Sequence, residues 1–195
     1  MQQRALLSLF LPLAALLPAA GCSDDDSGGS TSNCQSGTTC TYDQAGNYTD
    51  SCIQGGCEYV CDGQGVNCNF TCRGGGCKFT CHNGATCDFD CIGGGCTTQC
   101  GSSANCHVSC TGGACTMNCA GQADCDMSCT GGGCTALADD VQSGHLSCTG
   151  DGCTLSCTNT DDCRLTGCTK GCTLNCGGAS TCENSCEVTD GCVTN

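Results

Sequence analysis

Short stretches in which polar and core-type residues alternate recur along most of the chain, and cysteines bracket them. In the segment 77–81, Cys77, Phe79 and Cys81 fall on one side of an extended backbone, while Lys78 and Thr80 fall on the other. Alternation with a period of two, bounded by Gly, Asn and Ser, is typical of a half-buried β-strand. The pattern therefore predicts many short strands, each with one face turned toward a core.

The cysteines repeat with a fixed period. From Cys68 onward their successive spacings are 4, 5, 4 and 6, which sum to a period of 19, with one-residue delays at Cys168 and Cys192. Each period holds two strands, one Gly-rich turn and one longer turn, and a repeat of this length is typical of a solenoid. We predict an all-β fold, a two-sided β-solenoid of 19-residue coils braced by disulfides over residues 52–195. Residues 34–51 are predicted to form an N-terminal cap region.

Equivalent residues of successive coils should lie side by side, so steps of one period define two columns of the predicted core. The first column contains Phe79, Thr98, Met117, Ala136, Leu155 and Leu174. The second column contains Phe70, Phe89, Val108, Met127, Leu146, Leu165 and Asn184. One modest side chain per strand makes a thin core, so cross-links must replace much of the usual packing.

Composition and charge narrow the class of protein further. The 195 residues include 31 Cys and 31 Gly but only three Tyr, four Phe and no Trp. Cysteine at this level indicates a disulfide scaffold made for an oxidising compartment. The formal net charge of −14, with five Lys and Arg together, argues against nucleic acid as a partner.

Strand geometry limits which cysteines can pair. Two cysteines four residues apart in an extended strand are about 13 Å apart, whereas a disulfide needs Cα atoms within roughly 7 Å of each other. Bonds must therefore cross turns or the interior of a coil. In one coil the two cysteines that flank the long turn are replaced together, by Ala138 and Gly144. Their joint loss predicts that equivalent positions are bonded to each other in the other coils.

This reasoning gives a list of expected disulfides. Across the long turns they are Cys61–Cys68, Cys81–Cys87, Cys100–Cys106, Cys119–Cys125, Cys157–Cys163 and Cys176–Cys182. At the Gly-rich turns, bonds between flanking cysteines are favoured over closure across the coil, such as Cys96–Cys110. These bonds are Cys72–Cys77, Cys91–Cys96, Cys110–Cys115, Cys129–Cys134, Cys148–Cys153, Cys168–Cys172 and Cys186–Cys192.

The N-terminus has the layout of an export signal, with Arg4, an apolar run over 5–17 and small residues before Cys22. The segment 17–22, Leu-Pro-Ala-Ala-Gly-Cys, resembles the lipobox of bacterial lipoproteins, although Ala19 stands where that family prefers Leu. The resemblance implies a lipoprotein signal peptide at residues 1–21 and a lipid on Cys22. The alternative is an ordinary cleaved signal followed by a chance cysteine.

Cysteine parity supports the lipid, because 30 cysteines remain without Cys22 and all can pair. Residues 22–33 are small and acidic, which predicts a flexible tether. The lipoprotein resemblance further implies a membrane partner reached through the lipid, in the bacterial cell envelope at the outer membrane or cell surface. There, Ser23 rather than Asp after the cysteine permits outer-membrane delivery.

The outward positions carry the candidate binding chemistry. On one face, Thr residues recur once per period at Thr97, Thr116, Thr135, Thr154 and Thr173. A threonine ladder on a disulfide-braced β-solenoid resembles hyperactive antifreeze proteins, which implies ice binding. The neighbouring column departs from the family's second Thr row at Gln99, Asn118 and Leu137. The alternative is that Thr simply suits solvent-facing strands.

The other face offers a weak candidate for a divalent-metal site, formed by Asp88, His107 and Asp126 at steps of one period. The alternative is a solvated face in which acid and imidazole alternate without like-charge stacking. Thiolate metal sites are not expected, because the Cys-x2-Cys and Cys-x-Cys spacings are absent. We expect no enzyme activity and no cofactor. The expected role is structural, adhesive or binding at the cell surface, with ice or a divalent metal as the alternative ligand.

Overall fold

The computed structural model describes residues 31–32, 34–186 and 192–195, and all regular secondary structure within them is β-strand. One sheet contains β1 (Thr31–Ser32), β3 (Gly46–Cys52), β5 (Val66–Cys72), β7 (Thr86–Cys91), β9 (Asn105–Cys110), β11 (Asp124–Cys129), β13 (Ser143–Cys148), β15 (Asp162–Thr166) and β17 (Thr181–Asn184). The other sheet contains β2 (Thr39–Tyr42), β4 (Glu58–Asp62), β6 (Lys78–His82), β8 (Thr97–Cys100), β10 (Thr116–Ala120), β12 (Thr135–Asp139), β14 (Thr154–Thr158), β16 (Thr173–Gly177) and β18 (Val193–Thr194).

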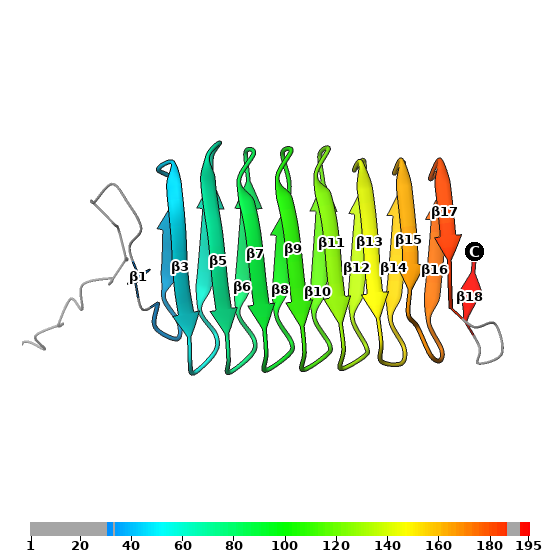
Figure 1. The fold of residues 1–195 in the computed structure, drawn as a ribbon, viewed down its shortest axis with the longest axis horizontal. Helices are drawn as coiled ribbons and strands as arrows, with labels where there is room; N and C mark the ends of the chain where they lie inside the picture. The colour runs from blue at the N-terminus through cyan, green and yellow to red at the C-terminus, as the bar shows by residue number, and fades with distance from the viewer. Residues whose placement is uncertain (1–30, 33, 187–191) are drawn as a thin grey trace, which may run out of the picture.

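Both sheets are parallel, and successive strands of the chain alternate between them. Each coil therefore contributes one strand to each sheet, and Figure 1 shows the coils side by side along the long axis of the molecule. Parallel strands cannot be joined by a tight hairpin. Here the chain returns through the opposite sheet instead. This arrangement confirms the predicted two-sided β-solenoid.

Most neighbouring strands are in register at the predicted step of one period. Met117, for example, pairs with Thr98 on one side and with Ala136 on the other. One coil is longer, because Cys61 pairs with Cys81, one position beyond the regular step. The additional residue lies in the turn between β4 and β5, so the coils before this turn fall out of the regular spacing.

The Gly-rich turns follow one edge of the solenoid, at the bottom of Figure 1. They pack backbone against backbone, and Gly76 N donates to Gly94 O at 2.9 Å. A Cβ at Gly75 would lie only 2.6 Å from Gly94 O, and Gly75 has a φ of +77°. Both the left-handed backbone and the close approach of the next turn therefore require glycine at this position.

Both predicted core columns are buried between the sheets, apart from Asn184 at the C-terminal end. At the N-terminal end the column is aromatic. Phe79 stacks on Phe89 of the opposite sheet with ring centroids 4.4 Å apart, and on Tyr59 of the preceding coil at 5.7 Å. Toward the C-terminus Leu and Met continue the two columns, so the core stays one side chain per strand.

The structure contains fourteen disulfides among the described residues, and all have Cα–Cα distances between 6.1 and 6.5 Å. Twelve of them are pairs that the repeat predicts, and every one of these spans a turn. The alternative closure Cys96–Cys110 does not form, since Cys96 is bonded to Cys91 and Cys110 to Cys115. Two further bonds, Cys34–Cys40 and Cys52–Cys57, brace the N-terminal coils.

The prediction of a Cys186–Cys192 bond is wrong for this structure, because both residues are free thiols. Their sequence separation is six, whereas the other bonds at the Gly-rich turns close over five residues or, at Cys168–Cys172, over four. Val193 also pairs with Thr173, one position beyond the regular step, so the last coil is out of the regular spacing.

In the coil without a long-turn disulfide, buried side chains lie in the turns beside the place where the bond would otherwise be. Val141, in the turn between β12 and β13, is 3% exposed. Thr160, in the next long turn, is 1% exposed and donates its hydroxyl to Ala138 O at 3.2 Å. Thr160 therefore packs beside Ala138 and Gly144, and Val141 is buried within the turn that lacks a cross-link.

The N-terminal coil departs from the repeat. Residues 34–51, predicted as a cap region, contain β2 and most of β3, and both strands pair in register with the next coil. Cys40 stands in the register position of Tyr59, and Asp50 in that of Phe70. Asp50 is 8% exposed, and its carboxylate accepts hydrogen bonds from Cys34 N and Tyr42 Oη, both at 3.0 Å. A hydrogen-bonded carboxylate thus replaces an aromatic ring at the first coil.

Candidate functional site

The outward side of the even-numbered sheet carries two columns of uncharged side chains over five coils. We call it the threonine face. Its first column contains Thr97, Thr116, Thr135, Thr154 and Thr173, paired in register. Its second column contains Gln99, Asn118, Leu137, Ser156 and Asn175. None of these ten side chains is charged, and the exposed carboxylate of Asp139 lies beside the second column, at the end of β12.

Side-chain hydrogen bonds connect neighbouring coils at the C-terminal end of the threonine face. Asn175 Nδ2 donates to Ser156 Oγ at 2.9 Å, and Asn195 Nδ2 donates to Asn175 Oδ1 at 2.9 Å. Leu137 interrupts the polar column and is 43% exposed. The face therefore combines fixed polar groups with one exposed apolar side chain near its centre.

The outward side of the odd-numbered sheet is charged, and we call it the ionic face. Its central column contains Asp88, His107, Asp126, His145, Arg164 and Glu183, one from each strand from β7 to β17. The sequence-predicted metal residues Asp88, His107 and Asp126 are therefore on three adjacent strands. All three line one shallow depression of about 580 Å³, together with Asp124 and His145.

Two histidine–carboxylate contacts lie on the ionic face. His107 Nδ1 is 3.7 Å from Asp126 Oδ2, and both side chains are about half exposed. His145 Nε2 is 3.3 Å from Asp162 Oδ2, a residue of the neighbouring column rather than of its own. Each imidazole thus contacts a carboxylate of the following coil, but in a different direction across the sheet.

Arg164 organises the C-terminal end of the ionic face. Its Nε donates to Asp162 Oδ1 at 2.9 Å and lies 3.6 Å from Glu183 Oε2. The hydrogen bond from Arg164 lowers the pKa of Asp162 below its usual range, and His145 adds to this effect. The carboxylates of this end therefore have a cationic partner, which Asp88 and Asp126 do not have on their own strands.

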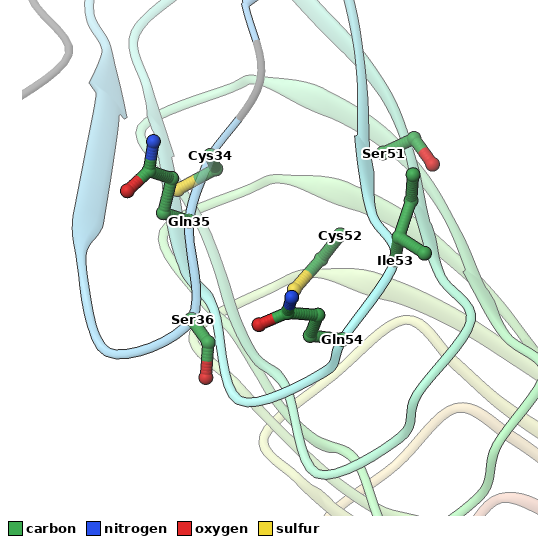
Figure 2. A pocket seen from close by; sticks show the side chains of 7 residues that line it. All are labelled: Cys34, Gln35, Ser36, Ser51, Cys52, Ile53 and Gln54. Atoms are coloured by element: carbon green, nitrogen blue, oxygen red, sulfur yellow. The ribbon is translucent and has the colours of Figure 1, made fainter.

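A second depression lies at the N-terminal end, beside the first Gly-rich turn. It has a volume of about 590 Å³ and lies between segment 34–36 and segment 51–54, whose side chains Figure 2 shows. Cys34 and Cys52 are in disulfides, and the other lining side chains are neutral. Ile53 beside it is 72% exposed. This depression brings together no acid, base or nucleophile, so we assign it no chemistry.

Sulfur atoms of neighbouring coils are close together in the core. Those of Cys81, Cys100 and Cys106 lie within 4.8 Å of one another. All three belong to disulfides, and a disulfide sulfur is not the thiolate that metals require. The free thiols of the described chain are Cys186 and Cys192. Burial raises the pKa of the Cys186 thiol above its ordinary value.

The predicted lipidation site Cys22, the signal segment 1–21 and the tether apart from residues 31–32 lie outside the described residues. Within the described part of the chain, no helix is long and apolar enough to cross a membrane. No protein-family model, curated protein or solved structure matches this chain.

Two features of these surfaces escape the periodic pattern. The His145–Asp162 contact crosses from one column to the next, so steps of one period cannot reveal it. The buried Asp50 has a usable signal, because it stands at an inward position of the alternation between Tyr48 and Cys52. An acid at a core position indicates a hydrogen-bonded carboxylate, and the structure contains one there.

Proposed function

We propose that this chain is a lipid-anchored structural or adhesive protein of the bacterial cell surface, which presents rigid polar faces to a partner outside the cell. The fold itself fits an extracellular structural or binding protein. The observation that supports the proposal is that fourteen disulfides brace coils whose two outward faces hold their side chains in register. Such a scaffold resists unfolding without a large core, as exposure outside the cell requires.

The anchor is the first element of the proposal. A lipid on Cys22 and the acidic tether over 22–33 would hold the solenoid by its N-terminal end, so that both faces stay free. The role is non-enzymatic. A repeated surface places similar groups on every coil, whereas catalysis needs one preorganised pocket. In the depression on the ionic face, the Ser143 hydroxyl donates its hydrogen bond to Asp124 rather than to a histidine.

Cell fractionation tests the anchored-scaffold function. We expect the wild-type chain in the membrane fraction and a Cys22→Ser variant in the soluble extracytoplasmic fraction, with equal resistance to added protease. A serine at this position cannot carry the thioether-linked lipid, while the solenoid begins beyond it and should fold as before. A Cys22→Ser variant that stays in the membrane fraction with an unchanged acyl mass would contradict the anchor.

The threonine face supports a second candidate function, ice binding. Five Thr side chains are in register beside a second column of uncharged side chains, with neighbouring strands about 4.8 Å apart. Thermal hysteresis in the wild type should disappear in Thr135→Tyr, because a large ring would stand out from the centre of this face. Ser128→Tyr, on the ionic face, should keep it. Absence of hysteresis in the wild type would eliminate this function.

A further inference from the structure

We propose that the ionic face binds a zinc-class divalent cation between β9 and β11, with His107 Nδ1 and Asp126 Oδ2 as ligands and Asp88 as the third. This proposal does not depend on the anchored-scaffold function. Imidazole and carboxylate together suit Zn²⁺, and a site with three protein ligands leaves positions for water. The cation would therefore be exchangeable and accessible to other ligands rather than a structural part of the core.

The separation of the two donors fits this ion. A tetrahedral zinc bound to one nitrogen and one carboxylate oxygen holds these atoms about 3.4 Å apart. His107 Nδ1 and Asp126 Oδ2 are 3.7 Å apart before any ion is considered. Asp88 is the register partner of His107 on the opposite side, so the imidazole stands between two carboxylate-bearing residues. The side chains of His107 and Asp126 are about half exposed, so they can adjust their positions around an ion, and the side chain of Asp88 would reach the ion from β7.

Charge favours a cation at this place rather than elsewhere on the ionic face. The strands β7, β9 and β11 carry four outward carboxylates, on Asp88, Asp90, Asp124 and Asp126. Among the described strands of the odd-numbered sheet, Arg164 is the one Lys or Arg, and it lies on β15. The four carboxylates thus have no Lys or Arg partner within their own strands.

The histidine–carboxylate pair at His145 is a poorer cation site, because a positive charge already lies beside its carboxylate. Asp162 Oδ2 lies 3.3 Å from His145 Nε2, but Asp162 Oδ1 accepts the hydrogen bond from Arg164. The guanidinium neutralises the carboxylate and would repel a second cation beside it. The chain therefore provides its own control, a histidine–carboxylate pair on the same face that should not bind zinc.

The backbone holds the proposed ligands in place. His107 and Asp126 are register partners on adjacent strands, and each directly follows a disulfide cysteine, Cys106 or Cys125. Both cysteines are bonded across the long turns to the opposite sheet. The spacing between the two ligand-bearing Cα atoms is thereby fixed before an ion arrives, which lowers the entropic cost of binding.

Titration of the full chain with Zn²⁺ at pH 7.5, followed through the histidine ring resonances, tests the site. The thiols of Cys186 and Cys192 are first alkylated, because free thiols would compete for zinc. We expect the His107 resonances to shift and saturate at one equivalent, while those of His82 and His145 stay unchanged. His107→Ala should abolish this binding, and Asp126→Asn should weaken it on the order of tenfold.

Two control arms complete the experiment. His145→Ala should bind Zn²⁺ as the wild type does, and excess Ca²⁺ should not displace Zn²⁺, since Ca²⁺ prefers oxygen ligands over imidazole. The proposal is overturned if the His107 resonances do not respond to Zn²⁺. It is equally overturned if His145→Ala loses as much affinity as His107→Ala, or if Ca²⁺ displaces Zn²⁺. Either result would mean that the face attracts cations diffusely through its carboxylates.

Discussion

A single hydroxyl interrupts the apolar column that runs through the even-numbered sheet. Thr98 is 1% exposed, lies between Phe79 and Met117, and its Oγ1 has no hydrogen-bond partner among the described residues. Burying a hydroxyl without a partner costs about 1–3 kcal/mol. Valine has almost the same shape and the same β-branched preference for strands.

We therefore expect Thr98→Val to raise the free energy of unfolding by about 1 kcal/mol, measured by guanidinium denaturation with the disulfides intact. Thr97→Val is the matched control, because this neighbour points outward and its hydroxyl meets water. That control should change stability by only a few tenths of a kcal/mol. A loss of stability in Thr98→Val would show that the hydroxyl has a partner, such as a buried water.

The two free thiols should differ in reactivity. Cys186 is buried and its pKa is raised by desolvation, whereas Cys192 is partly exposed. The thiolate is the reactive form of cysteine. Because the pKa of Cys186 is raised, a smaller fraction of its thiol is ionised at any pH below that pKa. We expect iodoacetamide to label Cys192 first, and labelling of Cys186 to accelerate as the pH rises.

Mass spectrometry of the native and the unfolded, unreduced protein gives the measurement. After unfolding, we expect two labels on the described residues of each chain. After a short exposure of the native protein to iodoacetamide, we expect mainly one. If no label enters even after unfolding, Cys186 and Cys192 are bonded to each other in the mature protein, and the sequence-based pairing holds at this turn. Faster labelling of Cys186 than of Cys192 would contradict the burial of the Cys186 thiol.

At the scale of strands and turns, alternation and period together determine most of this fold. The segment around Phe79 predicts a strand that faces the core with every second residue, and β6 does so. The repeat period predicts which residues become neighbours, including His107 between Asp88 and Asp126. Register follows from period here because one coil supplies one strand to each sheet.

The pattern fails where a coil has no equivalent to compare with. Cys40 and Tyr42 exchange their core positions in the first coil, so neither the Cys34–Cys40 bond nor the buried Asp50 follows from the repeat. The contact of His145 with Asp162 depends on side-chain direction across two columns, which a one-dimensional period does not contain. Local departures of this kind need three-dimensional packing to resolve them.

The coil without a long-turn bond offers a test of the pairing rule. Ala138 and Gly144 occupy the bonded positions, and a Cβ at Gly144 would lie 2.7 Å from Ala138 Cβ. A disulfide needs Cβ atoms about 3.5–4.5 Å apart, so the strands must separate by about 1 Å. We expect Ala138→Cys with Gly144→Cys to form a fifteenth bond, but to stabilise by less than the about 2 kcal/mol of an unstrained short ring.

Thiol counting and melting curves on three variants provide the measurement. Each single variant should have one more free thiol than the wild type. The double variant should have the same number of free thiols as the wild type. Adding Val141→Ala to the double variant should recover part of the lost stabilisation, because Val141 is buried in the turn that the new bond would close. Two additional thiols in the double variant would mean that the tighter packing of this coil excludes the bond.

At the scale of the whole molecule, the two sheets divide the surface chemistry between them. Over the coils from β8 to β16 the even-numbered sheet presents mostly neutral side chains, with Asp139 at the end of β12 as the exception, while the odd-numbered sheet presents carboxylates, imidazoles and one guanidinium. Neither face is visible as a cluster in the sequence, because its members are a full period apart. The separation arises only when the coils stack, and it allows one molecule to offer two different binding surfaces.

Because each coil contacts mainly its neighbours, a whole coil should be removable. Excision of the segment Thr135–Cys153 joins Cys134 to Thr154 and removes one complete disulfide, Cys148–Cys153. The stacking then continues with Met117 on Leu155 and Asp126 on Arg164, an apolar pair inside and an opposite-charge pair outside. We expect a folded solenoid, shorter by one strand spacing of about 4.8 Å.

Excision of Thr135–Gly152, one residue shorter, is the matched control. It removes Cys148 and so leaves Cys153 without its disulfide partner. At the new junction Cys134 is followed by Cys153, whereas in the first excision it is followed by Thr154. A shift of one residue in a strand turns every inward side chain outward, so the control should expose core residues and additional thiols. Small-angle scattering, circular dichroism and thiol counting distinguish the two. If both excisions fold equally well, register is not what binds one coil to the next, and the solenoid must gain its stability within each disulfide-closed turn instead.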